Sequence, residues 1–73
     1  MSDTRRTSVS SSSIASVGFT AESSLDVEFR NGTMYRYFMV PRAVFDALMA
    51  SESKGSFFNR HIRPRFRYTR LGQ

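Results

Sequence analysis

The feature that most constrains the fold is the dipeptide Asn31-Gly32, which divides the stretch Leu25 to Val40 into two runs of alternating apolar and polar residues. Asn-Gly between two such runs is the strongest short-range signal for a β-hairpin. We therefore expect two antiparallel strands that are joined by a tight turn at this dipeptide.

The register of this hairpin depends on the type of its turn. A two-residue Asn-Gly turn would place Val27 opposite Arg36, which pairs apolar with polar on a face that should be buried. A type I turn with the glycine as a left-handed bulge residue instead places Val27 opposite Tyr35 and Asp26 opposite Arg36. We predict the bulged turn, because like residues then share a face and the opposite charges pair across the strands.

This register gives the hairpin two different faces. The apolar face holds Leu25, Val27, Phe29, Tyr35, Tyr37 and Met39. The other face, which we expect to be mixed and partly solvated, holds Asp26, Glu28, Met34, Arg36 and Phe38. A hairpin with one apolar face needs a third strand and a covering helix to be stable.

The flanking segments supply these elements. Residues 14–19 read as a first strand, and residues 20–24 form a polar turn into the hairpin. From Arg42 to Ser51 the apolar residues recur at helical spacing, which predicts a helix that packs on the apolar face of the hairpin. We expect this helix to follow Pro41 and to be stopped by Gly55, a residue typical of helix C-termini.

The C-terminal part reads as a second short helix and a last extended segment. The helix is expected over residues 56–63, with Ser56 as its cap, with Phe58 and Ile62 facing inward, and with a polar face opposite them. Beyond Pro64, which ends the helix, Phe66 and Tyr68 alternate with polar residues, so we expect both rings to be buried by a short strand or extended segment. The fold class is therefore α+β: a three-stranded antiparallel meander, two short helices on one face and this final segment.

Composition limits the chemistry of the chain and predicts its organisation. Its 73 residues include no cysteine and a single histidine, which argues against disulfides, thiol chemistry and a histidine-based zinc site. No apolar run approaches the roughly 20 residues that span a bilayer, and the N-terminus lacks the apolar region of a signal peptide, so we expect a cytoplasmic protein without membrane contact. The serine-rich residues 1–12 are expected to be disordered, and residues 13–71 to form a single domain.

The distribution of charge is the strongest indication of function. The net charge is +5, yet residues 53–73 hold six basic residues and no acidic one, whereas residues 1–52 carry a net charge of −1. Such asymmetry favours an anionic partner, and arginine suits RNA in particular because its planar fork binds phosphate and stacks on bases. The alternative is a solvated basic surface. The candidate nucleic-acid-binding residues are Lys54, Asn59, Arg60, Arg63, Arg65 and Arg67.

Three ring-bearing residues are candidates for the rim of such a site. Tyr35 and Tyr37 are able to stack bases if they are exposed, but the predicted register points them to the buried face, which favours a structural role. His61 stands beside Arg60 and Arg63, where a lone histidine more often packs or lines a rim than catalyses. Nothing places a nucleophile, base and acid together, so we expect no enzyme activity, no cofactor, no metal and no small-molecule substrate.

These residues resemble the KTSC domain, a module found at the C-terminus of some lysyl-tRNA synthetases and as stand-alone bacterial proteins. The resemblance covers roughly residues 12–71. It rests on Ser13-Ile14, Val17-Gly18-Phe19, Val27 to Gly32, the Tyr35-x-Tyr37 signature, Val40-Pro41, Ser53-Lys54-Gly55, Phe57-Phe58-Asn59 and Ile62-Arg63. Arg67 stands where the family pattern leads us to expect a proline. The function of the family is not established, and the resemblance implies RNA binding only through the synthetase context.

The sequence therefore leads to two functional hypotheses of different classes. The first is a non-enzymatic module that binds RNA or another polyanion through the basic C-terminal surface, with affinity that falls steeply as salt rises. The second is a protein-interaction or homodimerising module that uses the face from Met34 to Phe38 or a free sheet edge. A third reading, a small hydrolase, would need a pocket around His61.

Overall fold

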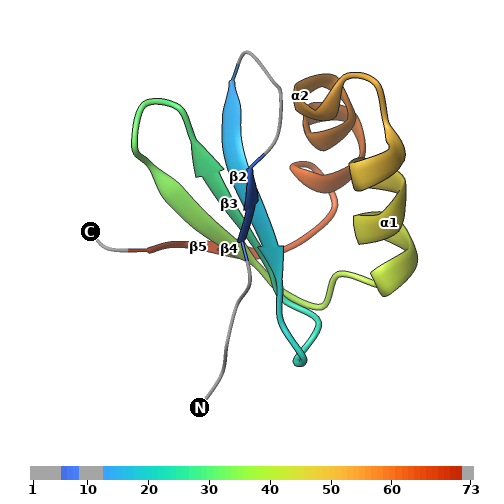
Figure 1. Cartoon of the computed structure of the whole chain (residues 1–73). Coiled ribbons are helices and arrows are strands. Elements are labelled where there is room, and N and C mark those ends of the chain that lie inside the picture. The colour runs from blue at the N-terminus through green and yellow to red at the C-terminus, as the bar shows by residue number, and fades with distance from the viewer. Residues whose placement is uncertain (1–5, 9–12, 72–73) are drawn as a thin grey trace.

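The structure of the chain is a computed structural model, and it describes residues 6–8 and 13–71. It has an α+β architecture in which one antiparallel sheet is covered on one side by helical segments (Figure 1). In chain order the elements are β1 (Arg6–Ser8), β2 (Ile14–Phe19), β3 (Leu25–Phe29), β4 (Met34–Tyr37), α1 (Arg42–Ala50), α2 (Lys54–Phe57), the π-helical turn η1 (Phe58–Ile62) and β5 (Tyr68–Leu71).

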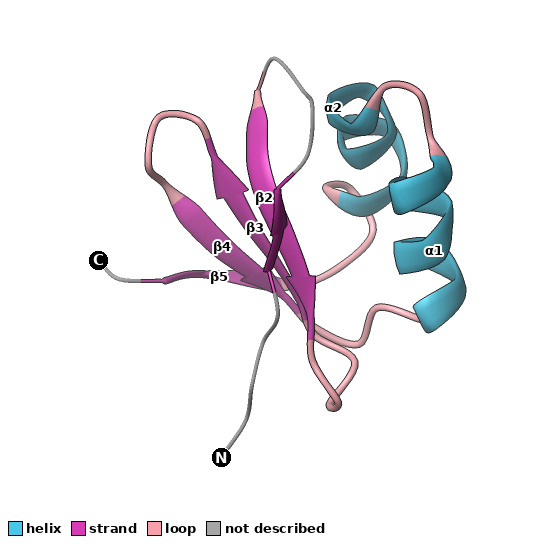
Figure 2. Ribbon diagram, in the orientation of Figure 1, coloured by secondary structure: helices cyan, strands magenta, loops and turns pink. Residues whose placement is uncertain are grey.

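The sheet has five strands in the order β1-β2-β3-β4-β5 (Figure 2). Its centre is the predicted meander of β2, β3 and β4, and the C-terminal segment adds β5 beside β4 as an edge strand. At the other edge β1 pairs with β2, although it lies within residues 1–12, for which the sequence predicted disorder. Backbone pairing along an edge does not require apolar side chains, so composition alone does not reveal it. The rest of that segment lies outside the described residues.

The central hairpin has the predicted bulged turn. Gly32 has a φ of 92°, its N–H donates to the Phe29 carbonyl at 2.9 Å, and the Phe29 N–H donates to the Thr33 carbonyl at 2.8 Å. Beyond the turn, Val27 lies opposite Tyr35. The remaining pairs also have the predicted register, Leu25 with Tyr37 and Asp26 with Arg36.

The second face of the hairpin is mixed and partly solvated, as predicted, but one of its charged residues is buried. Asp26 is only 1% exposed, because it lies on the central strand β3 and its carboxylate is covered by the side chain of Arg36. Beside this pair, the Ser16 hydroxyl donates to Glu28 Oε1 at 2.9 Å. The polar residues of this face therefore satisfy one another instead of relying on water.

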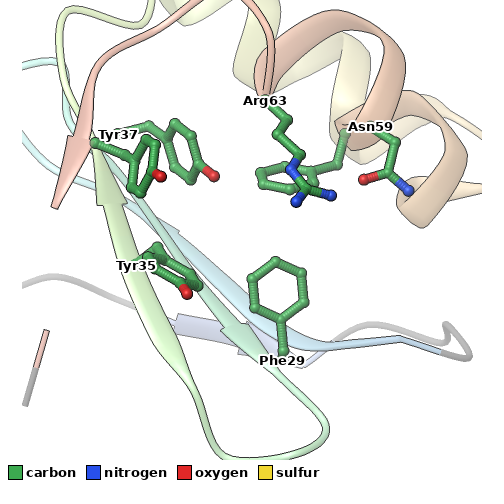
Figure 3. Close-up of a pocket in the computed structure, with 7 residues that line it drawn as sticks. Phe29, Tyr35, Tyr37, Asn59 and Arg63 are labelled. Carbon is green, nitrogen blue, oxygen red and sulfur yellow. The ribbon is translucent and has the colours of Figure 1, made fainter. Parts of the chain in front are cut away.

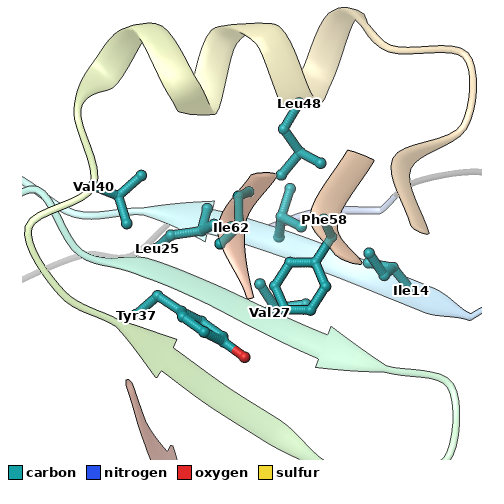
Figure 4. Close-up of a cluster of buried hydrophobic side chains, with 9 residues drawn as sticks. Ile14, Leu25, Val27, Tyr37, Val40, Leu48, Phe58 and Ile62 are labelled. Atoms are coloured by element: carbon teal, nitrogen blue, oxygen red, sulfur yellow. The ribbon is translucent and has the colours of Figure 1, made fainter. Parts of the chain in front are cut away.

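The core lies between the sheet and the helical segments (Figure 4). As predicted, α1 contributes Leu48, and the second helical segment contributes Phe58 and Ile62. The side chains with almost no exposure are Ile14, Val17, Leu25, Val27, Tyr37, Val40, Leu48, Phe58 and Ile62. Burying these side chains is the main source of stability in a domain of this size.

The boundary between the two helical segments differs from the prediction. The second segment begins at Lys54 rather than at Ser56, so Gly55 lies inside a helix instead of stopping one. The first segment ends at Ala50, where the hydroxyl of Ser51 donates to the Leu48 carbonyl at 2.9 Å and the Lys54 ammonium donates to the Ser51 carbonyl at 3.0 Å. These two side chains satisfy carbonyls at the helix end, which removes the need for a left-handed glycine.

The C-terminal strand is also less buried than predicted. Phe66 is half-buried against the core, but Tyr68 is 58% exposed, because it lies on the edge strand β5 where only one side of the strand is paired. No helix in the described ranges is long and apolar enough to cross a membrane.

Candidate functional site

An aromatic pocket lies on the helical side of the sheet, close to its β5 edge. It is formed by β3, β4, β5 and η1, has a volume of about 160 Å³, and is lined by Phe29, Tyr35, Tyr37, Phe58, Asn59, Arg63 and Tyr68. Both tyrosines of the Tyr-x-Tyr pair therefore line one pocket together with two of the polar residues that the sequence nominated for nucleic-acid binding.

The strand register explains how the tyrosines come together. Residues two apart on a strand share a face, so Tyr35 and Tyr37 point the same way from β4. On β5, Tyr68 lies opposite Tyr37 and Arg70 lies opposite Tyr35. Directly opposed residues of an antiparallel pair project from the same face, so Tyr68 and Arg70 leave the sheet on the side of the pocket.

The π-helical turn supplies the polar wall of the pocket. The N–H of Arg63 donates to the carbonyl of Phe58, five residues earlier, at 2.9 Å. This wide turn keeps Phe58 and Ile62 in the core, and π-helical turns of this kind are often found at functional sites. Figure 3 shows the Arg63 guanidinium pointing from the helical segment into the space that the aromatic rings surround, with Asn59 beside it.

Burial and charge act in opposite directions on the buried tyrosine of the pocket. Tyr37 is 3% exposed, and this burial raises the pKa of its hydroxyl above the ordinary value of 10.0. The positive charge of Arg63 acts to lower that pKa, whereas Tyr68 and Tyr35 act to raise it further. The phenol therefore stays neutral at physiological pH and faces a cation.

A second hollow lies at the end of β4, where the chain leaves the sheet for α1. It has a volume of about 200 Å³ and is lined by Phe38, Met39, Arg65, Phe66 and Arg67. Met39 is 81% exposed and has a left-handed φ of 57°, and the Phe38 N–H donates to the Arg67 carbonyl at 2.8 Å. Two more of the predicted binding residues, Arg65 and Arg67, thus flank an exposed apolar patch.

The other nominated residues lie elsewhere. Arg60 is exposed and lines neither of these pockets. The ring of His61 lies 4.6 Å from that of Phe57, and His61 likewise lines neither pocket. The ammonium of Lys54 is engaged with the end of α1, as described above. The structure therefore divides the predicted basic surface into an aromatic part and an apolar part.

The arginines of this surface form no ion pair with any described residue. Within residues 6–8 and 13–71 the ion pairs formed are Arg36 with Asp26 and Arg42 with Asp46, so none involves the arginines of the C-terminal part. Those arginines are Arg60, Arg63, Arg65, Arg67 and Arg70, and all five are exposed. A surface of this kind attracts anions, and the part of the chain that is described contains no cluster of three His, Cys, Asp or Glu side chains for a metal ion.

Sequence reasoning missed four residues of this site. Phe29 and Phe58 were predicted for the core, Tyr68 was predicted to be buried, and Arg70 was counted only for its charge. The pairing of β5 with β4 is what brings Tyr68 and Arg70 beside Tyr35 and Tyr37. The signal that would have found them is this register, which the sequence does not specify because no short turn joins the two strands.

Comparison with known proteins places the chain in one family. The family model of the KTSC domain matches residues 10–66. A crystal structure of a KTSC domain protein from Yersinia pestis superimposes with a TM-score of 0.91 at 35% sequence identity, covering 96% of this chain and 100% of that one.

Related sequences include both small proteins and a segment of a larger enzyme. An uncharacterised protein of Stutzerimonas stutzeri is 41% identical over 69 residues, which is 92% of this chain and 97% of the relative. A lysine–tRNA ligase of Trichormus variabilis is 40% identical over 47 residues, 64% of this chain but 8% of that enzyme. The fold, the family model and these relatives agree, and the chain belongs to the KTSC domain family.

Proposed function

We propose that this protein is a small binding module for single-stranded RNA, and that it binds through the exposed arginines between η1 and β5. The observation that carries the proposal is the set of five exposed arginines without an ion-pair partner among the described residues, Arg60, Arg63, Arg65, Arg67 and Arg70. Phosphate oxygens are the natural partners of such a surface, because guanidinium groups bind them through two parallel hydrogen bonds.

Single-stranded RNA suits the surface better than a featureless polyanion. Aromatic side chains lie among the arginines, with Tyr35 and Tyr68 in the aromatic pocket and Phe38 in the second hollow. Proteins that bind single strands combine a basic groove with such rings, on which bases stack. The similarity to a segment of lysine–tRNA ligases, whose name states that they act on tRNA, also favours an RNA partner.

The proposal is tested by fluorescence anisotropy of a labelled single-stranded RNA at 50 and 200 mM salt. If five arginines each neutralise one phosphate, the affinity should fall about 100-fold between these concentrations, because the slope per phosphate is about −0.7 for single strands. The Arg65→Gln/Arg67→Gln variant should bind more weakly and show a fall of only about 20-fold. Absence of binding at 50 mM salt would refute the proposal.

A matched pair of variants distinguishes binding at the proposed surface from binding that depends only on net charge. Arg42→Gln removes one positive charge from α1, outside the proposed surface, and should leave the affinity within about twofold of the wild type. Arg60→Gln removes the same charge from the proposed surface and should weaken binding and reduce the salt slope by about 0.7. Equal effects of the two variants would mean that binding follows net charge and has no site.

The second candidate function is protein association through the apolar hollow, and one observation favours it. Met39 is exposed in a strained left-handed conformation beside the exposed ring of Phe38. Residues kept in such conformations cluster at binding sites. This alternative predicts association that tolerates salt and is lost in Phe38→Asp with the arginines intact, measured by analytical ultracentrifugation for self-association and by pull-down for another protein.

A further inference from the structure

The five rings of the aromatic pocket form a closed cycle in which each ring contacts the next. The centroid distances are 5.9 Å from Phe29 to Tyr35, 5.5 Å from Tyr35 to Tyr68, 5.3 Å from Tyr68 to Tyr37, 5.2 Å from Tyr37 to Phe58 and 5.5 Å from Phe58 to Phe29. Four of these contacts are edge-to-face, an arrangement that aromatic pairs prefer and that fixes the orientation of each ring. The pocket is therefore a preformed aromatic enclosure.

The size of the enclosure limits what it can hold. Its volume of about 160 Å³ is close to that of cavities of about 150 Å³ that hold benzene. One six-membered ring with small substituents fits this space, and a base pair does not. Three of the lining residues are exposed, Asn59, Arg63 and Tyr68, so solvent reaches the enclosure and a ring can enter without unfolding the core.

The polar side chains of the pocket limit which ligands it can bind. Aromatic enclosures without a cation take quaternary ammonium groups, but here the Arg63 guanidinium points into the space between the rings (Figure 3). Its charge repels a cationic ligand, and a guanidinium donates hydrogen bonds without accepting any. Asn59 adds an amide that both donates and accepts. The occupant must therefore present acceptor atoms on a small planar ring.

Positive charge outside the enclosure indicates what the ring is attached to. Arg70 lies opposite Tyr35 in the sheet register, two residues beyond Tyr68, and leaves β5 on the face that holds the pocket. Together with Arg63 it provides two cations beside the planar site. This juxtaposition matches a nucleotide, in which a planar heterocycle with acceptor oxygens is joined through a sugar to phosphate.

We propose that the aromatic enclosure takes one unpaired pyrimidine base of a single-stranded RNA, with Arg63 and Asn59 on the acceptor edge of the base and Arg70 on the adjoining phosphate. This inference rests on the proposed function, which it extends from phosphate binding to recognition of a base. The pyrimidine fits because it is a single six-membered ring, whereas a purine adds a fused five-membered ring.

The test compares three labelled oligomers of equal length and equal charge by fluorescence anisotropy: oligouridine, oligoadenosine and an oligomer of abasic sites. The wild-type protein should bind oligouridine at least about 5-fold more tightly than the abasic oligomer, because stacking of one base on an aromatic side chain is worth such a factor or more. It should also prefer oligouridine to oligoadenosine. These comparisons need no variant, so they do not depend on the folding of a mutant.

Variants then assign the preference to the pocket. Tyr68→Ala should bring oligouridine binding down to the level of the abasic oligomer, and Tyr68→Phe, which keeps the ring, should restore it. Phe45→Ala removes a half-buried ring of α1, which lines neither pocket and lies outside the proposed surface, and it should leave the preference for uridine unchanged. Circular dichroism verifies that each variant is folded.

The outcomes separate this inference from the function on which it rests. Equal binding of oligouridine and the abasic oligomer would overturn the base site and leave phosphate binding by the arginines intact. Tighter binding of oligoadenosine would overturn the assignment to a pyrimidine. Absence of binding to all three oligomers would overturn both the proposed function and the base site.

Discussion

Arg36 donates two hydrogen bonds to the buried carboxylate of Asp26, from β4 to the neighbouring strand β3. Its Nε donates to Oδ1 at 2.7 Å and its Nη2 donates to Oδ2 at 2.9 Å. Asp26 is 1% exposed and Arg36 is 36% exposed, so the carboxylate depends on this one partner, and the hydrogen bond to Asp26 is the main reason that the pKa of Arg36 is raised. The pair therefore helps to fix the register that aligns Tyr35 and Tyr37 with β5.

Removing the arginine of this pair should destabilise the domain strongly. Arg36→Ala leaves the Asp26 carboxylate buried without a partner, and the expected cost is about 2–3 kcal/mol in the free energy of unfolding. Asp46→Ala, which breaks the exposed pair of Arg42 and Asp46, is the matched control and should change stability by less than about 0.5 kcal/mol. Urea denaturation followed by circular dichroism measures both. Equal effects would show that Asp26 does not depend on Arg36.

The bulged turn should require glycine at one position. Gly32 has a φ of 92°, and a β-carbon built there would meet no atom within 4 Å, so the cost of replacing it is conformational and not steric. Gly32→Ala should lower the free energy of unfolding, measured by urea denaturation, by about 1 kcal/mol. Gly32→Asn should lower it less, because asparagine tolerates the left-handed region.

 An alanine variant as stable as the wild type would contradict the left-handed turn.

The buried tyrosine should make the protein sensitive to alkaline pH. Burial raises the pKa of Tyr37 above its unfolded value of about 10. Its contribution to stability is therefore complete below about pH 10 and is lost as the pH rises through the folded-state pKa, because the unfolded chain gives up the proton first. The variant Tyr37→Phe keeps the aromatic ring but has no hydroxyl group that can ionise.

Denaturation of the wild type and of Tyr37→Phe across pH 8 to 11 measures this effect. The stability of the wild type relative to the variant should fall above about pH 10. A titration of tyrosine absorbance should show the matching loss of a late-ionising group in the variant. A stability difference that stays constant over this range would contradict the burial of a neutral phenol.

The core at α1 should be sensitive to truncation. Leu48 is the fully buried residue of this helix, and it packs in the cluster that contains Leu25 and Val27. Leu48→Ala should cost about 2–5 kcal/mol, whereas Ala47→Ser on the exposed side of the helix should cost less than about 0.5 kcal/mol. Thermal denaturation gives the comparison, and a Leu48→Ala variant with an unchanged midpoint would show that α1 does not hold the sheet.

Local patterns in the sequence were enough to predict the central part of the fold. The meander, the register of Val27 with Tyr35, and the inward side of α1 follow from alternation, turn chemistry and helical spacing, all of which act over a few residues. The pairing of β5 with β4 joins segments about 30 residues apart, and no short turn sets its register. For this reason the pocket could be predicted only in part, with the two tyrosines of β4 assigned to the right face.

The helix boundaries show a second limit of local patterns. Gly55 was expected to stop a helix, but in the structure Lys54 and Ser51 satisfy carbonyls at the end of α1, and the glycine joins the next helical segment. Likewise regular helical spacing grouped Asn59, Arg60 and Arg63 on one polar face, whereas in the structure Asn59 and Arg63 line the pocket and Arg60 does not. Side-chain capping and irregular turns depend on tertiary contacts that spacing does not encode.

The central claim is that RNA binds between η1 and β5, and the most direct measurement is an NMR titration of ¹⁵N-labelled protein with a uridine-rich single strand. The largest shifts should fall on the backbone and arginine side-chain signals of Asn59, Arg63, Tyr68 and Arg70, whereas β1 and the exposed side of α1 should remain unchanged. Shifts that cluster on α1 or β1, or the absence of shifts at RNA concentrations far above that of the protein, would contradict the claim.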